Sequence, residues 1–133
     1  MKKVIVFGAF DNLHEGHIHM LREAKEYGDF LIVVVGRDEI VTQVKGRKPV
    51  YSEEERRAHV EKLNIADKVR LAAEGDDRYQ TIAEEKPDII ALGYNQREFV
   101  DKLTDAVEEY VQIVRLQPFK SDVFNEFYKS LDY

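Results

Sequence analysis

Two histidines three positions apart are the residues of this chain whose types and spacing best fit catalysis. They close the segment Gly8-Ala9-Phe10-Asp11-Asn12-Leu13-His14-Glu15-Gly16-His17. An apolar run precedes this segment and helical spacing follows it, so we expect His14 and His17 on one face at the start of a helix. The N–H groups that a helix leaves free in its first turn attract anions, and two imidazoles add directional donors. The pattern predicts a polyphosphate-binding site.

Two glycines, Gly8 and Gly16, belong to the same segment as the histidines. Because neither glycine carries a side chain, a ligand can approach the backbone closely at both positions.

Zinc is the alternative ligand of the histidines. Two histidines at this spacing could ligate zinc, but a zinc site needs a third or fourth ligand. His19 is the nearest further histidine, and residues two apart on a helix do not face each other. We therefore expect no metal ligands here and interpret His19 and His59 as surface or half-buried structural residues.

The elements that must position the histidines alternate along the chain. Short apolar runs predict strands at residues 4–7, 30–35, 69–72, 89–93 and 111–116, and helical spacing predicts helices at 17–27, 77–85 and 97–110. Ser52 and Glu55 form a capping box that begins a further helix. From Val44 to Val50 we expect one long irregular stretch. Continuous apolar strands separated by helices predict an α/β fold, a Rossmann-like three-layer sandwich with a parallel five-stranded sheet and helices on both faces.

Composition narrows the class of protein. The 133 residues predict one domain spanning 1–133, with 20 Lys+Arg against 26 Asp+Glu, a net charge of -6 and no cysteine. The lack of cysteine excludes disulfide scaffolds, thiol catalysis and cysteine-ligated zinc. The acidic balance argues against a general nucleic-acid or membrane-surface binder, and no apolar run approaches the ~20 residues that cross a bilayer. We expect a cytoplasmic protein that binds neither nucleic acid nor membrane.

The segment from Gly8 to His17 resembles the HxGH motif of the nucleotidylyltransferase superfamily. The fuller form of that motif, G-x-F-D-x-L-H-x-G-H, is matched at every defined position. The resemblance implies that His14 and His17 contact the phosphates of a nucleoside triphosphate and stabilise charge at the α-phosphate. It also implies nucleotide contacts from the residues around the histidines, namely Gly8, Ala9, Phe10, Asp11 and Gly16. Asp11 has two open roles, which are to help hold a metal ion or to order the turn into the helix.

Two further segments are similar to archaeal FAD synthases and related cytidylyltransferases. One reads Arg37-Asp38-Glu39, followed by Lys45-Gly46-Arg47-Lys48-Pro49. The resemblance implies that Arg37 binds nucleotide and that Lys45 reaches the triphosphate as a mobile point charge. The other segment is the helix that follows Ser52, where Arg56 matches a family arginine near the nucleotide. Arg57 is the neighbouring alternative, and both could instead form surface pairs with glutamates.

The last elements that the resemblance implies lie late in the chain. Gly93 and Asn95 stand in a turn where the family usually carries aspartate, so the base preference of relatives does not transfer directly. The family also has a Ser/Thr-rich segment that donates to the β- and γ-phosphates. Two Lys-Ser pairs are candidates for this segment, and they offer Ser121 and Ser130. A plain loop and a plain tail are the alternatives.

The resemblance implies transfer of a nucleoside monophosphate from a nucleoside triphosphate to a small phosphate-bearing acceptor, with release of pyrophosphate. Mg²⁺ is the expected cofactor, since it offsets phosphate charge. ATP with FMN, giving FAD, is the first hypothesis, and CTP with glycerol 3-phosphate is the second. A non-catalytic nucleotide-binding module is the alternative from another class. Relatives also imply a homodimer.

Overall fold

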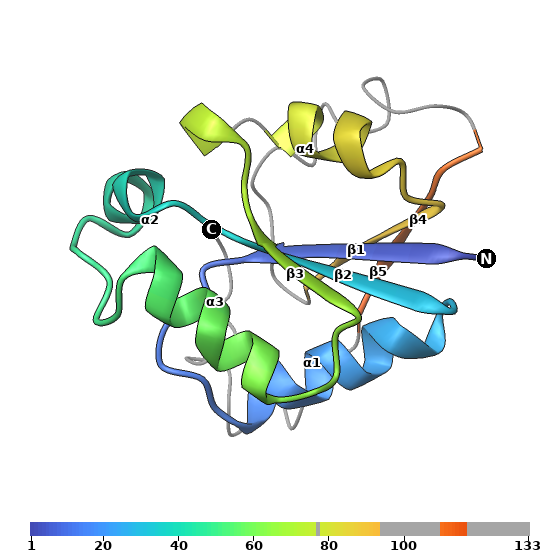
Figure 1. Cartoon of the computed structure of the whole chain (residues 1–133), viewed down its shortest axis with the longest axis horizontal. Helices are drawn as coiled ribbons and strands as arrows, with labels where there is room; N and C mark the ends of the chain where they lie inside the picture. Colours follow the sequence, from blue (N-terminus) through green and yellow to red (C-terminus); the bar gives the residue numbers. More distant parts are fainter. Residues whose placement is uncertain (77, 94–109, 117–133) are drawn as a thin grey trace.

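Five parallel strands form one sheet in the computed structural model, which describes residues 1–76, 78–93 and 110–116. The strands are β1 (Lys3–Gly8), β2 (Phe30–Val35), β3 (Lys68–Leu71), β4 (Ile89–Leu92) and β5 (Gln112–Arg115). The helices are α1 (Glu15–Glu26), α2 (Asp38–Lys45), α3 (Glu53–Lys62) and α4 (Arg78–Glu85), with a short 3-10 helix η1 (Glu74–Asp76). Figure 1 shows the sheet edge-on between its helices.

Apolar and β-branched residues build the two central strands. β1 and β2 pair in parallel along their whole length, and every residue after the first in each strand is buried. Successive side chains of a strand point to opposite faces. Val4 and Val6 therefore join the core on one side of the sheet, while Ile5 and Phe7 join the core on the other. Burial on both faces explains why these strands are continuous apolar runs.

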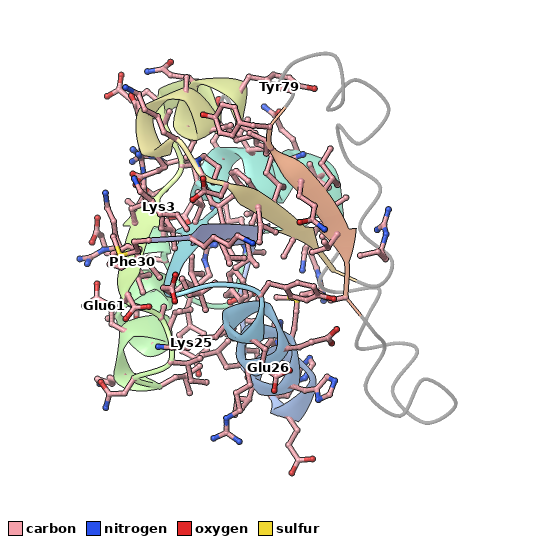
Figure 2. The ribbon with its side chains drawn as sticks, turned by 90° about the vertical axis from the view of Figure 1, so that its right-hand side faces the viewer. Lys3, Lys25, Glu26, Phe30, Glu61 and Tyr79 are labelled. Carbon is pink, nitrogen blue, oxygen red and sulfur yellow. The ribbon has the colours of Figure 1, made fainter. Side chains whose placement is uncertain are left out.

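Helices cover both faces of the sheet, as the sequence predicts. Leu21 of α1 and Val60 of α3 pack on the face that carries Val4, whereas Ile82 of α4 packs on the opposite face. Figure 2 looks along the strands from the end where Lys3 begins β1, with α4 on one side of the sheet and α1 and α3 on the other. The predicted three-layer α/β sandwich is confirmed.

The strand order creates a topological switch point at the centre of the sheet. The order across the sheet is β3-β2-β1-β4-β5. The chain moves outward from β1 to β3 and then returns to the other side of β1 with β4 and β5. In such sheets, ligands bind beyond the carboxyl ends of the strands where the order reverses. The segment that contains His14 and His17 follows β1, and Gly93 follows β4, so both lie at this point.

Helix α2 is the main departure from the predicted elements, because the sequence predicts no helix between the second strand and Ser52. The irregular stretch begins at Gly46 rather than at Val44. Gly46 ends α2 in the left-handed conformation, with φ 74°, and donates its N–H to Thr42 O. A glycine in this conformation is a common C-terminal signal of helices. Helix α2 is only eight residues long, which is shorter than the about 11–18 residues over which helical spacing is normally recognised.

The other predicted elements are present within the described residues, with ends that differ by one or two positions. The predicted helix at 97–110 lies outside the described residues except for its last position. None of the helices that the structure describes is long and apolar enough to cross a membrane.

A buried carboxylate ties α4 to the edge strand β3. Glu85 accepts hydrogen bonds from Lys68 Nζ at 2.9 Å and from Arg70 Nη1 at 2.8 Å. Burial raises the pKa of Glu85, but these hydrogen bonds outweigh it and hold the pKa below its ordinary value of 4.5. A carboxylate with a lowered pKa stabilises the fold above the pKa it has in the unfolded chain, and this contribution is lost as the pH falls.

We predict that Glu85→Gln lowers the free energy of unfolding at neutral pH by about 1–3 kcal/mol, because it removes a charged acceptor from two cations. The difference from the wild type shrinks as the pH is lowered, because the carboxylate then gains a proton. Urea unfolding at neutral pH and at a series of lower pH values measures both effects. Glu84→Gln is the control, since Glu84 pairs with Arg70 on the exposed side of the same helix. Equal losses in the two variants at neutral pH would contradict the role of the buried carboxylate.

Candidate active site

The two histidines cap the first turn of α1 reciprocally. His14 is the N-cap residue, and its Nδ1 accepts a hydrogen bond from Gly16 N at 3.1 Å. His17 turns back so that its Nδ1 accepts from His14 N at 3.2 Å. The two ring centroids lie 4.0 Å apart. This arrangement is a capping box in which imidazoles replace the usual Ser or Thr and Glu, and it brings both rings together as the spacing predicts.

The capping hydrogen bonds determine which ring nitrogen carries the proton. A nitrogen that accepts from a backbone N–H has no proton of its own, so the network assigns the proton of each neutral imidazole to Nε2. His17 is 1% exposed, and its Nε2 has no hydrogen-bond partner among the described residues. A buried donor without a partner costs about 1–3 kcal/mol. An acceptor such as a phosphate oxygen removes this cost, so the geometry fits anion binding.

The surroundings of His17 keep its ring uncharged. Burial, together with the smaller effects of the charges of His14 and Lys45, lowers the pKa of His17 from 6.5 to about 3. Burial also lowers the pKa of His14. The ring of Phe10 lies with its centroid 5.8 Å from that of His17 and forms part of the apolar cover. At neutral pH, both imidazoles therefore offer N–H donors without the desolvation cost of a buried cation.

The loop between β1 and α1 has an unusual backbone conformation. Phe10 and Asn12 have positive φ angles of 53° and 55°, which residues with side chains seldom adopt. The Phe10 ring lies over Gly8, where an added Cβ would be 2.8 Å from Phe10 Cε2. A Cβ on Gly16 would be 2.9 Å from His14 Cε1. Both glycines thus make room for the protein's own rings, and the expected close approach of a ligand to their backbone stays a prediction.

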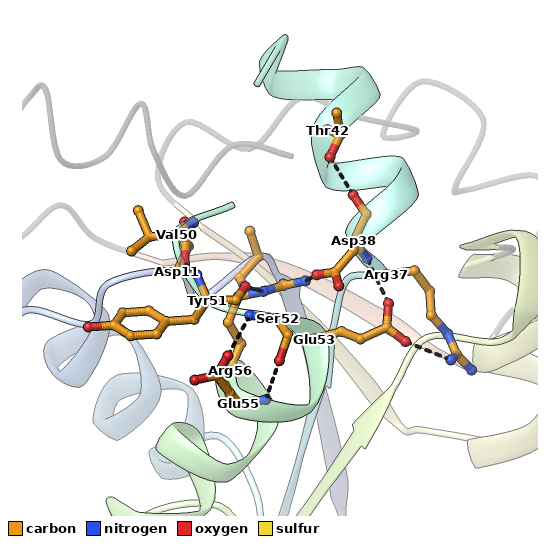
Figure 3. Close-up of polar contacts among 11 residues, drawn as sticks. Asp11, Arg37, Asp38, Thr42, Val50, Tyr51, Ser52, Glu53, Glu55 and Arg56 are labelled. Carbon is orange, nitrogen blue, oxygen red and sulfur yellow. Dashed lines mark hydrogen bonds and ion pairs between the residues drawn. The ribbon is translucent and has the colours of Figure 1, made fainter. Parts of the chain in front are cut away.

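Asp11 ties this loop to the segment before α3. Its carboxylate oxygens accept hydrogen bonds from Val50 N at 2.7 Å and from Tyr51 N at 3.0 Å (Figure 3). The carboxylate therefore orders a neighbouring loop. In the part of the chain that the structure describes, no group of three or more His, Asp or Glu side chains is arranged to hold a metal ion. A Mg²⁺ ion bound mainly by phosphate oxygens needs no such group, so the expectation of Mg²⁺ stays a prediction.

Lys45 lies close enough to the histidines for its charge to act on His17, and its expected contact with the triphosphate stays a prediction. It is the last residue of α2, and its charge acts on His17. Burial lowers the pKa of Lys45, the carboxylate of Asp11 opposes this effect, and the charges of Arg47 and Arg56 add to it. The lysine therefore provides positive charge near the imidazoles.

Arg56, which the resemblance implies is near the triphosphate, is buried within the protein. Its side chain is 0% exposed. The guanidinium donates to Ala9 O at 2.7 Å, to Tyr51 O at 3.0 Å and to Asp38 Oδ1 at 2.6 Å. Figure 3 shows Arg56 between Tyr51 and Asp38. Because these acceptors engage all three nitrogens, a contact with the triphosphate would compete with bonds inside the protein, and the expected contact stays a prediction.

Arg37 and Arg57 are also engaged within the protein. Arg37 donates to Ala72 O at 2.8 Å and to Glu53 Oε2 at 3.1 Å, and so joins the ends of β2 and β3 to the start of α3. The nucleotide contact expected of Arg37 would compete with these bonds. Arg57 pairs with two glutamates on the exposed face of its own helix and lies outside the site.

Two acidic residues that sequence reasoning missed support this region. Glu53 Oε1 accepts from Asp38 N at 2.8 Å, and Asp38 in turn pairs with the buried arginine. The sequence gives one signal for Asp38 and Glu53, because acidic side chains are favoured in the first turn of a helix and each of them stands in one.

The remaining predicted residues lie at or beyond the end of β4. Gly93 is buried, and its carbonyl accepts from Arg115 Nη1 at 2.8 Å. Asn95, Ser121 and Ser130 lie outside the described residues, so their expected contacts stay predictions.

The fold and the site together define a nucleotidyltransferase. A helix that starts at the switch point presents two imidazole N–H groups, with a lysine beside them. The chain belongs to the cytidylyltransferase-like family, whose sequence profile matches residues 5–133. This match confirms the resemblance that was inferred from the segment between Gly8 and His17.

Curated relatives are similar to the chain over most of its length. An FAD synthase of Thermoplasma volcanium is 40% identical over 122 residues, which cover 90% of this chain and 84% of the relative. An FAD synthase of Aciduliprofundum boonei is 39% identical over 128 residues, covering 94% and 85%. An FAD synthase of Pyrococcus abyssi is 41% identical over 118 residues, covering 86% and 79%.

Solved structures show the same fold. A protein of Thermoplasma volcanium, described as a lipopolysaccharide core biosynthesis protein, matches with a TM-score of 0.81 and 40% identity, covering 90% of this chain and 99% of that chain. A pantoate–β-alanine ligase of Francisella tularensis matches with a TM-score of 0.63 and 16% identity, covering 96% of this chain and 70% of that chain. The second likeness concerns the fold alone.

We predict that His17→Asn separates the two roles of this ring. Asparagine keeps an acceptor near the position of Nδ1, so His14 N stays capped, but it has no donor at the position of Nε2. We expect melting within a few degrees of the wild type and turnover at least a hundredfold lower, since one such donor contributes about 2.7–4 kcal/mol to transition-state stabilisation. Circular dichroism melting and a pyrophosphate-release assay measure the two effects.

His17→Gln is the matched control for this experiment. Glutamine reaches the Nε2 position with its amide but loses the capping acceptor, so it should retain more turnover than His17→Asn and melt at a lower temperature. Turnover of His17→Asn within tenfold of the wild type would contradict the assigned role of Nε2.

Proposed function

We propose that this enzyme transfers the AMP group of ATP to FMN, giving FAD and pyrophosphate. The buried Nε2–H of His17 carries the proposal, because a donor without a partner at the switch point fits a phosphate oxygen of a bound nucleotide. Three FAD synthases that are 39–41% identical over 86–94% of this chain support ATP and FMN as the substrates.

The proposed reaction is an in-line displacement at the α-phosphorus of ATP. An oxygen of the FMN phosphate attacks, and the new O–P bond forms as the bond from the α-phosphorus to the bridging oxygen breaks. The electron pair of the broken bond leaves with pyrophosphate, so no oxidant or reductant takes part. Negative charge develops on the oxygens around the α-phosphorus. The Nε2–H groups of His14 and His17 donate to these oxygens, and as neutral donors they need not transfer a proton.

Lys45 supplies the mobile positive charge in this proposal. It binds the triphosphate from the end of α2, and the bonds from Asp11 to the following loop keep that loop in place. When bound, Mg²⁺ offsets the remaining phosphate charge and makes pyrophosphate a better leaving group. We also propose that the enzyme is a homodimer and that it acts in the cytoplasm. Size-exclusion chromatography with light scattering measures its oligomeric state.

Pyrophosphate release with each pair of ATP or CTP and FMN or glycerol 3-phosphate tests the proposed reaction. We predict turnover with ATP and FMN, with FAD identified by chromatography and the reaction stopped by EDTA and restored by Mg²⁺. Turnover with CTP and glycerol 3-phosphate alone would replace the proposal with the second hypothesis. Tight ATP binding in calorimetry, with no pyrophosphate from any pair, would indicate a nucleotide-binding module instead.

A further inference from the structure

One buried guanidinium joins three segments around the site. Arg56 donates from Nη1 to Ala9 O at 2.7 Å, from Nε to Tyr51 O at 3.0 Å and from Nη2 to Asp38 Oδ1 at 2.6 Å. Two of these partners, Tyr51 and Asp38, flank Arg56 in Figure 3. All three nitrogens of the guanidinium therefore donate to protein acceptors.

Each acceptor belongs to a segment that leads to a functional group. Ala9 begins the loop that runs from β1 to the two histidines. Asp38 begins α2, whose last residue is Lys45, and Tyr51 ends the loop that follows this lysine. Val41, in the middle of α2, packs on Ala9 and adds an apolar contact between the same two segments. The position of Lys45 relative to the imidazoles thus depends on the contacts of Arg56.

The energetics of this network favour a single arrangement. The side chain of Arg56 is fully buried, whereas that of Asp38 is 42% exposed. A buried guanidinium is costly unless its donors are paired, and breaking one bond leaves an uncompensated charge. A buried polar network with satisfied donors is rigid and specifies one geometry. The β1–α1 loop and α2 therefore cannot shift relative to each other without a large penalty.

We infer that Arg56 is a positioning residue, which holds Lys45 at a fixed place relative to His14 and His17 through Asp38 and Ala9 and does not bind the triphosphate. This inference deepens the proposed function and rests on it for its kinetic readout. The competing role is direct contact of Arg56 with phosphate. A direct contact acts independently of Asp38, whereas a positioning role requires the bond between the two residues.

A double-mutant cycle distinguishes the two roles. Arg56→Lys keeps the positive charge but cannot form the three-way fork, and Asp38→Asn weakens the same connection from its exposed end. We expect each single variant to lower kcat at least tenfold, with KM for ATP changed less than threefold. The double variant should fall no more than about threefold below the worse single variant, because both changes break one connection.

Arg57→Lys is the matched control, since it makes the same change one position along α3 on the exposed face. Its kcat should stay within twofold of the wild type. Multiplicative losses in the cycle, or a rise in KM for ATP at unchanged kcat in Arg56→Lys, would overturn the positioning role. Melting curves report whether Arg56→Lys folds. If it does not, Asp38→Asn decides alone, and wild-type kcat in that variant would overturn the inference.

Failure of the proposed function is recognised separately. If the wild type makes no FAD, the substrate assignment fails, and the same cycle run on whichever substrate pair releases pyrophosphate still tests Arg56. If no pair does, ATP affinity is measured by calorimetry. Arg56→Lys should then bind ATP within about threefold of the wild type, as expected of a residue that does not contact the triphosphate, and a larger loss would overturn the positioning role.

Discussion

The reciprocal hydrogen bonds between His14 and His17 are the interaction on which the rest of the site depends. Each ring uses Nδ1 to satisfy a backbone N–H at the start of α1. In the usual capping box, the side-chain oxygens bond backbone N–H groups of the first turn. An imidazole has a second nitrogen, and capping through Nδ1 leaves that nitrogen protonated. The same bonds that begin the helix therefore orient two N–H donors, so folding of α1 and preorganisation of the site are one event.

The surrounding structure protects this arrangement. Gly8 and Gly16 provide space for the rings of Phe10 and His14, and burial keeps His17 neutral. The β1–α1 loop, with its strained backbone, is held by contacts to segments far along the chain rather than by its own sequence. This is the usual requirement for a strained loop at a functional site. The switch point of the sheet then places the helix start where a nucleotide can reach it.

The sequence predicted the sheet and the location of the site because both depend on local patterns. Apolar runs reveal strands that are buried on both faces, and a ten-residue motif marks the helix start. Helix α2 is harder to recognise because its eight residues are fewer than the window over which helical spacing is normally read. The enclosure of Arg56 could not be predicted, because its partners Ala9 and Asp38 lie 47 and 18 positions away in the sequence. Motif matching shows that an arginine lies near a site, but its partners decide whether it faces the ligand.

Nitrogen-15 NMR of the histidine side chains tests the central claim most directly. At neutral pH the free enzyme should show His17 neutral and protonated on Nε2, and the ring should stay neutral down to about pH 5, since its pKa is about 3. Adding a non-hydrolysable ATP analogue should shift the Nε2 resonance much more than that of Nδ1. A ring protonated on Nδ1, a charged ring at neutral pH, or an Nε2 resonance unaffected by the nucleotide would contradict the account.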